Sequence, residues 1–353
     1  MKIIFLYSEL QPYLLPVFKI LIEKHSVQIH IVYWDQNIRK KTPYIPDDIK
    51  GLFLYPRSKY GFREIMNVCR DVNPDAIFVS GWMDYIYLGI TSIYRRRGVP
   101  IIVGFDDIWL GTFRQSIAQV LSPLFTKILF SHAWVSGPRQ YEYAKRLGFK
   151  DRFVFPNLYS CNFDLFNEAF KSISIKKNNY PKAFLFVGRF APEKNIKLLV
   201  SAFEKYRETF KGTWKLICIG NGPLLDLLLN HPDIEVNQFS SQSEIIKSMA
   251  RSGVFVLASL KDVSPLVVHE AACAGLPMIL SSNIGNIPLF MIHNYNGVVF
   301  NSGSVDDLAK SMCLMANKST EDLIFMGEKS HQLACRITPE ITAASFVSIL
   351  SSK

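Results

Sequence analysis

Short aliphatic and β-branched runs alternate along the whole chain with longer segments of helical periodicity. This alternation is typical of parallel sheets covered by helices on both faces, because each crossover between parallel strands needs a long connection. The strands expected in the first half lie at residues 2–7, 27–34, 51–55, 76–80, 100–105, 133–137 and 152–156. Those expected in the second half lie at residues 183–188, 214–220, 234–239, 254–259, 277–281 and 297–300. The sequence therefore predicts an α/β protein with two doubly wound, Rossmann-like units.

The length of 353 residues is enough for two domains that each bury a core. We expect the first domain at 1–166 and the second at 183–337. Residues 167–182 between them are polar, rich in lysine and end near a proline, which is typical of a linker. Because ligands bind at the carboxyl ends of parallel strands, we expect the two domains to face each other across a cleft.

The opening run MKIIFLYS is too short for the apolar part of a signal peptide, and no cleavage site follows at the right distance. No apolar stretch reaches about 18 residues without interruption; the best candidate, 117–137, is broken by Pro123, Lys127 and His132. The six cysteines show no spacing typical of zinc sites or disulfide frameworks. We therefore expect a cytoplasmic protein with reduced cysteines, no metal site and no membrane-spanning helix.

The net charge of +10 is concentrated in the first half of the chain. Residues 1–165 hold 21 Lys and Arg against 14 Asp and Glu. Basic stretches at 39–41 and 94–98 suit an anionic membrane surface or an anionic acceptor, while ordinary solvated surface explains them equally well. No nucleic-acid-binding motif accompanies the charge, so we expect no nucleic acid partner.

The segment FLFVGRFAPEKNIKLLVSAF (184–203) combines a strand, a turn at Gly188, two cations and a helix start. Arg189 and Lys194 lie on the loop, and Asn195 is expected to cap the helix. Free N–H groups at a helix start, together with a guanidinium and an ammonium, can hold a diphosphate without a metal. The alternative is an exposed loop with incidental charges.

Two further segments repeat the order of strand, loop and helix. Gly220 and Gly222 in ICIGNGPLLDLL would let a ligand approach the backbone, although a plain strand-to-helix turn explains them as well. In DVSPLVVHEAACAGLPMILS (262–281), Glu270 falls within a helix of small and apolar residues, where a buried carboxylate needs partners. Hydroxyl groups of a ligand would supply them. Asp262 lies on the loop before that helix, and His269 is expected only to pack.

These three segments together resemble the retaining family 4 glycosyltransferases of the GT-B fold, in the order and spacing of that family. The resemblance covers nearly all of the second half of the chain. It implies that residues 1–166 bind the acceptor and that residues 183–337 bind a nucleotide sugar. It also implies that the last helix, within 338–353, packs back onto the first domain and couples closure to binding.

The resemblance implies roles for the donor-site residues. Arg189 and Lys194 would hold the diphosphate of the donor and stabilise the leaving nucleotide, beside Gly188, Gly220 and Gly222. Glu270 would accept hydrogen bonds from the ribose hydroxyls. Asp262 stands where the family usually has Glu and would meet the transferred sugar.

Other positions depart from the family pattern. Pro265 replaces a glycine, so the backbone amides of Leu266 and Val267 are the expected contacts to phosphate or sugar. In the first domain Asp106 stands about where the family has a histidine, and either it receives the proton of the acceptor or it caps a loop. Further acceptor contacts are expected from residues that also have plain packing or loop roles, namely Glu9, Gln11, Trp82, Asp84 and Asp107.

We therefore expect a retaining, metal-independent glycosyltransferase without a cofactor. The expected donor is a UDP-sugar or a GDP-sugar, and the expected acceptor is a glycan or a polyprenyl-diphosphate-linked glycan. Such an enzyme would build O-antigen (lipopolysaccharide), capsule or exopolysaccharide at the inner face of the cytoplasmic membrane. Two alternatives stay open, a nucleotide-sugar epimerase of the same fold and a non-catalytic protein that binds nucleotide sugars.

Overall fold

Two separate parallel sheets, with seven and six strands, are present in the computed structural model, which describes residues 1–35, 49–171, 179–229, 231–238 and 241–352. The chain divides into two units. The first unit comprises residues 1–160 and 339–353, and the second comprises residues 161–338. The predicted α/β class with two doubly wound sheets is confirmed.

The sheet of the first unit has the strand order β3-β2-β1-β4-β5-β6-β7, and all of its pairings are parallel. Its strands are β1 (Lys2–Tyr7), β2 (Gln28–Tyr33), β3 (Leu52–Pro56), β4 (Ala76–Ser80), β5 (Ile101–Phe105), β6 (His132–Val135) and β7 (Val154–Phe155). The central strands β1, β4 and β5 are almost entirely buried. This is why they read as continuous apolar runs rather than as alternating patterns.

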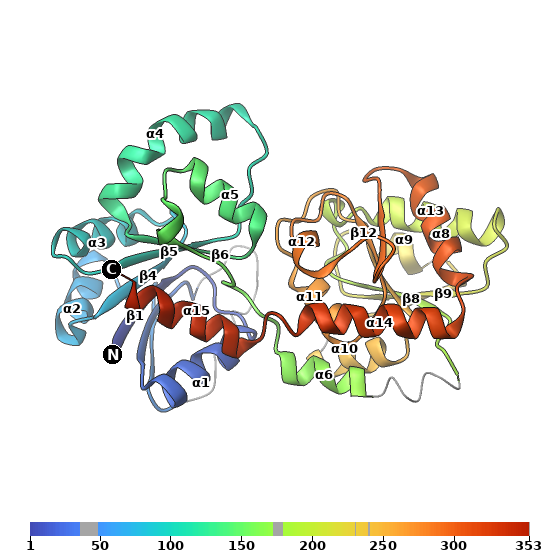
Figure 1. The fold of residues 1–353 in the computed structure, drawn as a ribbon, viewed down its shortest axis with the longest axis horizontal. Coiled ribbons are helices and arrows are strands. Elements are labelled where there is room, and N and C mark those ends of the chain that lie inside the picture. The colour runs from blue at the N-terminus through green and yellow to red at the C-terminus, as the bar shows by residue number, and fades with distance from the viewer. Residues whose placement is uncertain (36–48, 172–178, 230, 239–240, 353) are drawn as a thin grey trace. The chain divides into compact units, whose positions relative to one another are not determined.

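The helices of the first unit cover both faces of this sheet. They are α1 (Leu14–His25), α2 (Phe62–Val72), α3 (Tyr85–Arg96), α4 (Phe113–Leu129), α5 (Pro138–Arg146), the short 3-10 helix η1 (Asp151–Phe153) and α15 (Pro339–Ser351). Helix α15 lies beside α1, as Figure 1 shows for the red and blue helices. Phe346 of α15 stacks on Phe5 of β1 with ring centroids 5.4 Å apart. The last helix therefore completes the core of the first unit.

The sheet of the second unit has the order β10-β9-β8-β11-β12-β13, again with parallel pairings. Its strands are β8 (Ala183–Val187), β9 (Lys215–Ile219), β10 (Ile234–Asn237), β11 (Val254–Leu257), β12 (Met278–Ser281) and β13 (Gly297–Phe300). Its helices are α6 (Phe163–Lys171), η2 (Pro192–Lys194), α8 (Ile196–Glu208), α9 (Asp226–Leu229), α10 (Gln242–Ala250), α11 (Leu266–Cys273), α12 (Ile287–Phe290), α13 (Val305–Ala316) and α14 (Thr320–Ala334). In both sheets the expected strands are present within one to two residues at each end.

The domain boundaries differ from the expected ones. The division falls after Ser160 rather than after residue 166, and residues 167–171 of the expected linker 167–182 belong to α6. The reason is packing, because Phe166 and Ala169 are buried where α6 contacts α10 and α11. The rest of that linker is described only at 179–182, and the basic stretch 39–41 lies outside the described residues.

One segment of the described chain, Thr320–Ser351, is long and apolar enough to cross a membrane by length and composition alone. It is not a single helix. Helix α14 ends at Ala334, and α15 begins at Pro339 in the other unit. Each helix buries one side in its own unit, α14 against α11 and α12, and α15 against α1.

Candidate active site

Loops that follow β8 and β9 run side by side at the carboxyl edge of the second sheet. The Gly188 N–H donates to the Ile219 carbonyl at 2.9 Å. A Cβ atom on Gly220 would lie 1.9 Å from the Gly188 carbonyl oxygen, and one on Gly222 would lie 2.4 Å from the Phe190 carbonyl oxygen. Both glycines are therefore required where the backbones of the two loops touch. Their predicted contact with the donor is a separate expectation that this packing does not test.

The loop after β8 carries the two predicted phosphate-binding cations. Asn195 ends η2 in the left-handed conformation, with φ 57° and ψ 44°, and its side chain makes no capping hydrogen bond to α8. The expected side-chain cap is therefore wrong, because a residue that caps a helix with its side chain normally has an extended backbone, whereas that of Asn195 is left-handed. The turn nevertheless places Lys194 next to Asn195, the residue that precedes α8.

Arg189 forms an ion pair with Glu193 on the same loop. Both side chains are exposed. A hydrogen bond within the loop holds the pKa of Glu193 below its ordinary value, and Arg189 lowers it further. We did not predict a role for Glu193 from the sequence, although opposite charges four residues apart, as in Arg189 and Glu193, often form an ion pair.

Lys194 forms an ion pair with Asp262, which lies 68 positions further along the chain, on the loop after β11. Both side chains are largely buried, with 21% and 15% of their surfaces exposed. The Ser259 hydroxyl lies 3.5 Å from the same Asp262 oxygen, at the limit of a hydrogen bond. The Asp262 carbonyl accepts from the Gly285 N–H at 2.7 Å, which ties this loop to the one after β12. Two predicted catalytic residues are thus brought together.

Helix α11 begins directly after this loop. Its cap position is Pro265, which offers no side-chain hydrogen bond to the first turn. The N–H groups of Leu266 and Val267 donate to none of the described residues. A helix start with free N–H groups carries a partial positive charge that favours an anion. The first turn of α11 therefore fits the predicted contacts to phosphate or sugar.

Glu270 lies one turn further along α11 and is half-buried. Burial raises the pKa of its carboxyl group to about 7. Within the described part of the chain this carboxylate has no hydrogen bond and no ion pair. Groups that donate hydrogen bonds, such as ligand hydroxyls, would stabilise its charged form.

The neighbouring His269 has the structural role that was expected. Its Nδ1 atom accepts from the Cys161 N–H at 3.1 Å, so Nε2 carries the proton and faces the Ala334 carbonyl at 3.3 Å. The ring stacks on Phe290 with centroids 4.4 Å apart. Burial lowers the pKa of His269 to about 4, so the ring is neutral and orients its own helix rather than a ligand.

In the first unit, Asp106 follows β5 at the carboxyl edge of that sheet. Burial raises the pKa values of Tyr7, Tyr13 and Tyr159, and the charge of Asp106 raises each of them further. Glu9 adds to this effect on Tyr7 and Tyr13. Carboxylates and phenols from three separate loops thus lie close together here. No sequence pattern indicated that Tyr159 joins Tyr7 and Tyr13, because it lies far from both along the chain.

Other predicted acceptor residues have mixed surroundings. Asp107 is exposed, beside Asp106. Gln11 is half-buried, and its carbonyl accepts from the Leu14 N–H at the start of α1. Trp82 is 37% exposed, and its ring lies 5.3 Å from that of Phe105. These positions agree with either a surface role or a packing role.

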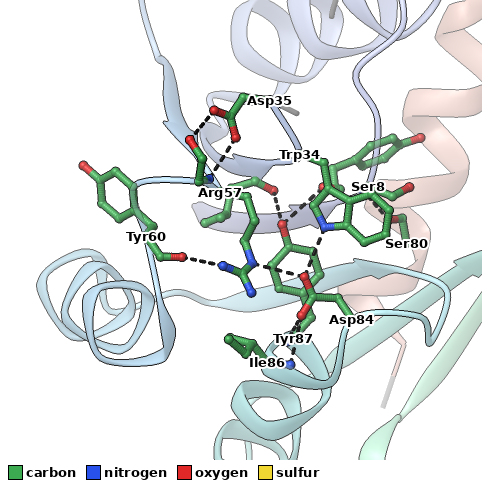
Figure 2. A network of polar contacts seen from close by, with 12 residues as sticks. Ser8, Trp34, Asp35, Arg57, Tyr60, Ser80, Asp84, Ile86 and Tyr87 are labelled. Atoms are coloured by element: carbon green, nitrogen blue, oxygen red, sulfur yellow. Dashed lines mark hydrogen bonds and ion pairs between the residues drawn. The ribbon is translucent and has the colours of Figure 1, made fainter. Parts of the chain in front are cut away.

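Asp84 has a structural role in place of the expected acceptor contact, as Figure 2 shows. Its carboxylate caps α3 by accepting from the N–H groups of Ile86 at 2.9 Å and Tyr87 at 3.3 Å. The other oxygen accepts from Trp34 Nε1 and Arg57 Nε, both at 3.1 Å. Only 10% of the Asp84 side chain is exposed. Four donors therefore occupy this carboxylate, which leaves little capacity for a ligand.

Comparisons with known sequences match the part of the chain that contains this site. Residues 167–330, slightly less than half of the chain, match the family model of glycosyl transferases group 1. The sulfoquinovosyl transferase SQD2 of Arabidopsis thaliana is 29% identical over 172 residues, which are 45% of this chain and 32% of that protein. The glycogen synthase of Mycobacterium tuberculosis is 31% identical over 125 residues, 33% of this chain and 30% of that protein. The chain thus spans about a third of the length of these relatives.

Solved structures resemble the chain over its whole length. Anabaena Alr3699/HepE in complex with UDP has a TM-score of 0.75 at 14% identity and is covered completely, as is this chain. WaaG, a glycosyltransferase involved in lipopolysaccharide biosynthesis, has a TM-score of 0.68 at 12% identity, again with full coverage of both chains. At such identities the likeness concerns the fold. Residues 167–330 therefore belong to the glycosyl transferases of group 1, and the chain has the GT-B fold that its motifs predicted.

Proposed function

We propose that the protein transfers a sugar from a nucleotide diphosphate donor to an acceptor hydroxyl, with retention at the anomeric carbon. The observation that carries the proposal is the Lys194–Asp262 pair beside the open first turn of α11. A cation, a carboxylate and free backbone N–H groups converge there at the carboxyl edge of a parallel sheet, where such sheets bind ligands.

The donor would lie along this edge. Its diphosphate would bind Arg189, Lys194 and the N–H groups of Leu266 and Val267, while Glu270 would accept from the ribose hydroxyls. Arg189 is exposed, and among the described residues its ion pair is with Glu193 of its own loop, so a diphosphate can displace Glu193. Lys194 is held more firmly by Asp262, which would then face the transferred sugar.

The proposed chemistry is a front-face displacement. The bond from the sugar to the departing phosphate oxygen breaks as the acceptor oxygen approaches the same face. That phosphate oxygen takes the proton of the acceptor, and Arg189 and Lys194 stabilise the negative charge that develops on the diphosphate. Each such electrostatic contact typically contributes about 3 kcal/mol to lowering the barrier.

The donor that we propose is a UDP-sugar, with a GDP-sugar as the second choice. Support comes from the fold neighbours that were solved with UDP and with UDP-glucose, both of Anabaena Alr3699/HepE. The proposed acceptor is a cell-envelope glycan, either free or lipid-linked. This choice agrees with the role of WaaG in lipopolysaccharide biosynthesis, and the carboxylate and phenol groups around Asp106 offer polar contacts for such an acceptor.

Thermal-shift measurements with a panel of nucleotide sugars test the donor site. We expect one donor to stabilise the wild type, and Arg189→Ala and Glu270→Ala to lose most of that shift. Lys205→Ala is the matched control, because it removes a surface cation whose partner is Asp306 and should keep the shift. The donor site is refuted when both site variants retain the full shift.

The products distinguish the proposed transfer from its alternatives. Incubation with the best donor and a lipid-linked or free glycan extract should give free nucleotide and a glycosylated acceptor. An epimerase would isomerise the sugar with donor alone. Tight donor binding without transfer or hydrolysis would identify a non-catalytic binding protein.

A further inference from the structure

Helix α4 of the first unit presents an apolar face to solvent. Each of its large apolar side chains on that face has between 45% and 82% of its surface exposed. They are Phe113, Ile117, Val120, Leu121, Leu124, Phe125 and Ile128. Figure 1 shows α4 at the outer margin of the unit, with α5 between it and the sheet. Isolated apolar residues are common on protein surfaces, but a continuous patch of this kind marks an interaction surface.

Apart from Leu129 at its end, which packs against the apolar core, the inward side of α4 is small or polar. Thr126 is the buried residue of the helix, and its hydroxyl donates to the Leu147 carbonyl at 3.2 Å. Gln115 bonds at 2.7 Å and 2.8 Å to backbone groups of the loop before the helix. Pro123 packs closely against Gly148. The amphipathic order is therefore the reverse of that in an ordinary surface helix, whose apolar side faces the core.

The apolar residues form one continuous stripe along α4. From Phe113 they recur at spacings of three and four residues, which is the period of one helix face. By the same period, Arg114 and Lys127 fall at the two margins of the stripe, near opposite ends of the helix, and both are exposed. The helix contains no acidic residue.

The surroundings of α4 are basic as well. Residues 85–152, which include α3, α4 and α5, hold ten Lys and Arg against four Asp and Glu. Arg96 and Arg97 at the end of α3 and Arg146 at the end of α5 are exposed, and α3 packs against α4. An apolar stripe within a cationic surface matches a bilayer with anionic headgroups, in which the charges attract lipid and the apolar side chains enter the acyl boundary.

We propose that α4 docks the protein on an anionic membrane surface, with the helix lying in the plane of the interface. A second copy of the chain is the competing occupant. Charge disfavours it, because two such surfaces placed face to face would bring like charges together without compensation. The proposal does not depend on the identity of the donor or on the chemistry of the second unit.

Vesicle co-sedimentation tests the proposal. We expect wild-type protein to bind vesicles of phosphatidylcholine mixed with phosphatidylglycerol, and to bind phosphatidylcholine alone far less. Val120→Glu with Leu124→Glu should reduce binding by at least about tenfold, because both side chains would lie in the acyl boundary. Arg114→Gln with Lys127→Gln should reduce binding about fivefold per charge and weaken its dependence on salt.

Leu314→Glu on α13 is the matched control, since Leu314 is a similarly exposed leucine in the second unit and should leave vesicle binding unchanged. Circular dichroism and the donor-induced thermal shift show that each variant is folded. The proposal is overturned by equal binding of the wild type and the Val120/Leu124 variant, or by no binding of the wild type. Light scattering without lipid tests for a second copy. If the wild type is a dimer and the Val120/Leu124 variant is a monomer, the proposal is overturned in favour of a second copy of the chain.

Discussion

The Lys194 ammonium and the Asp262 carboxylate form a largely buried ion pair that joins the loop after β8 to the loop after β11. The pair places a charge of each sign at the start of α11. Asp262 also fixes its own loop, because its carbonyl accepts from Gly285. Both the geometry and the chemistry of the candidate active site therefore depend on the Lys194–Asp262 contact.

Asp262→Ala should lower the free energy of unfolding by about 1–3 kcal/mol, because Lys194 would lose the carboxylate that compensates its partly buried charge. Urea unfolding measures the change. Asp306→Ala is the control, because it breaks the exposed Lys205–Asp306 pair and should cost less than about 1 kcal/mol. Equal decreases in the free energy of unfolding of the two variants would show that the Lys194–Asp262 pair stabilises the fold no more than an exposed ion pair does.

Nucleotide binding should weaken as the pH falls through about 7, where Glu270 gains a proton and can no longer accept two hydrogen bonds as a carboxylate. The limiting slope is about tenfold in affinity per pH unit. Isothermal titration with the best nucleotide at several pH values measures it. Glu270→Gln should bind more weakly above that pH and show no such slope. If the affinity of Glu270→Gln depends on pH as steeply as that of the wild type, another group is responsible for the pH dependence.

The same carboxyl group should affect stability in the opposite sense. Its pKa is about 7 in the folded protein and 4.5 for an ordinary Glu, so the folded state binds the proton more tightly than the unfolded chain. The unfolding free energy contributed by Glu270 thus falls as the pH rises between these two values. Buried His132 and His269, with pKa values lowered to about 4, oppose this trend below about pH 6.5. The difference between wild type and Glu270→Gln isolates the glutamate.

Gly220→Ala should destabilise the second unit by about 1–3 kcal/mol and reduce donor binding, because the new Cβ would overlap the Gly188 carbonyl oxygen. Gly303→Ala is the control. Gly303 also has a positive φ, 89°, but a Cβ there meets nothing within 4 Å. Thermal unfolding with and without donor compares the two variants. Similar losses would mean that backbone conformation, rather than the contact between loops, sets the cost.

Asp84→Ala should destabilise the first unit by about 2–4 kcal/mol, because it removes the cap of α3 and leaves Arg57 without its carboxylate. Asp107→Ala should change stability by less than about 0.5 kcal/mol, since Asp107 is exposed. Urea unfolding and acceptor KM separate the two roles. A stable Asp84→Ala variant with a raised acceptor KM would restore the role that the sequence predicted.

Much of the fold followed from the sequence because its signals are local. Strand and helix periods repeat within a few residues, and the parallel arrangement follows from their alternation. The loops that carry Arg189, Lys194 and Asp262 were recognisable because each directly follows a strand. The expected linker was placed too broadly, since the polar residues of α6 concealed a short helix whose apolar side packs on α10 and α11.

Only the tertiary structure decided which of these residues meet. The sequence identified Lys194 and Asp262 separately, but their contact spans 68 positions and depends on β8 and β11 being neighbours in the sheet. Composition likewise showed that α4 is apolar, whereas its packing showed that the apolar side faces outward. The physical reason is the same in both cases. The pattern of side chains along the sequence determines whether a segment forms a helix or a strand. The elements that pack against that segment determine which of its faces is buried, which binds a ligand and which is exposed.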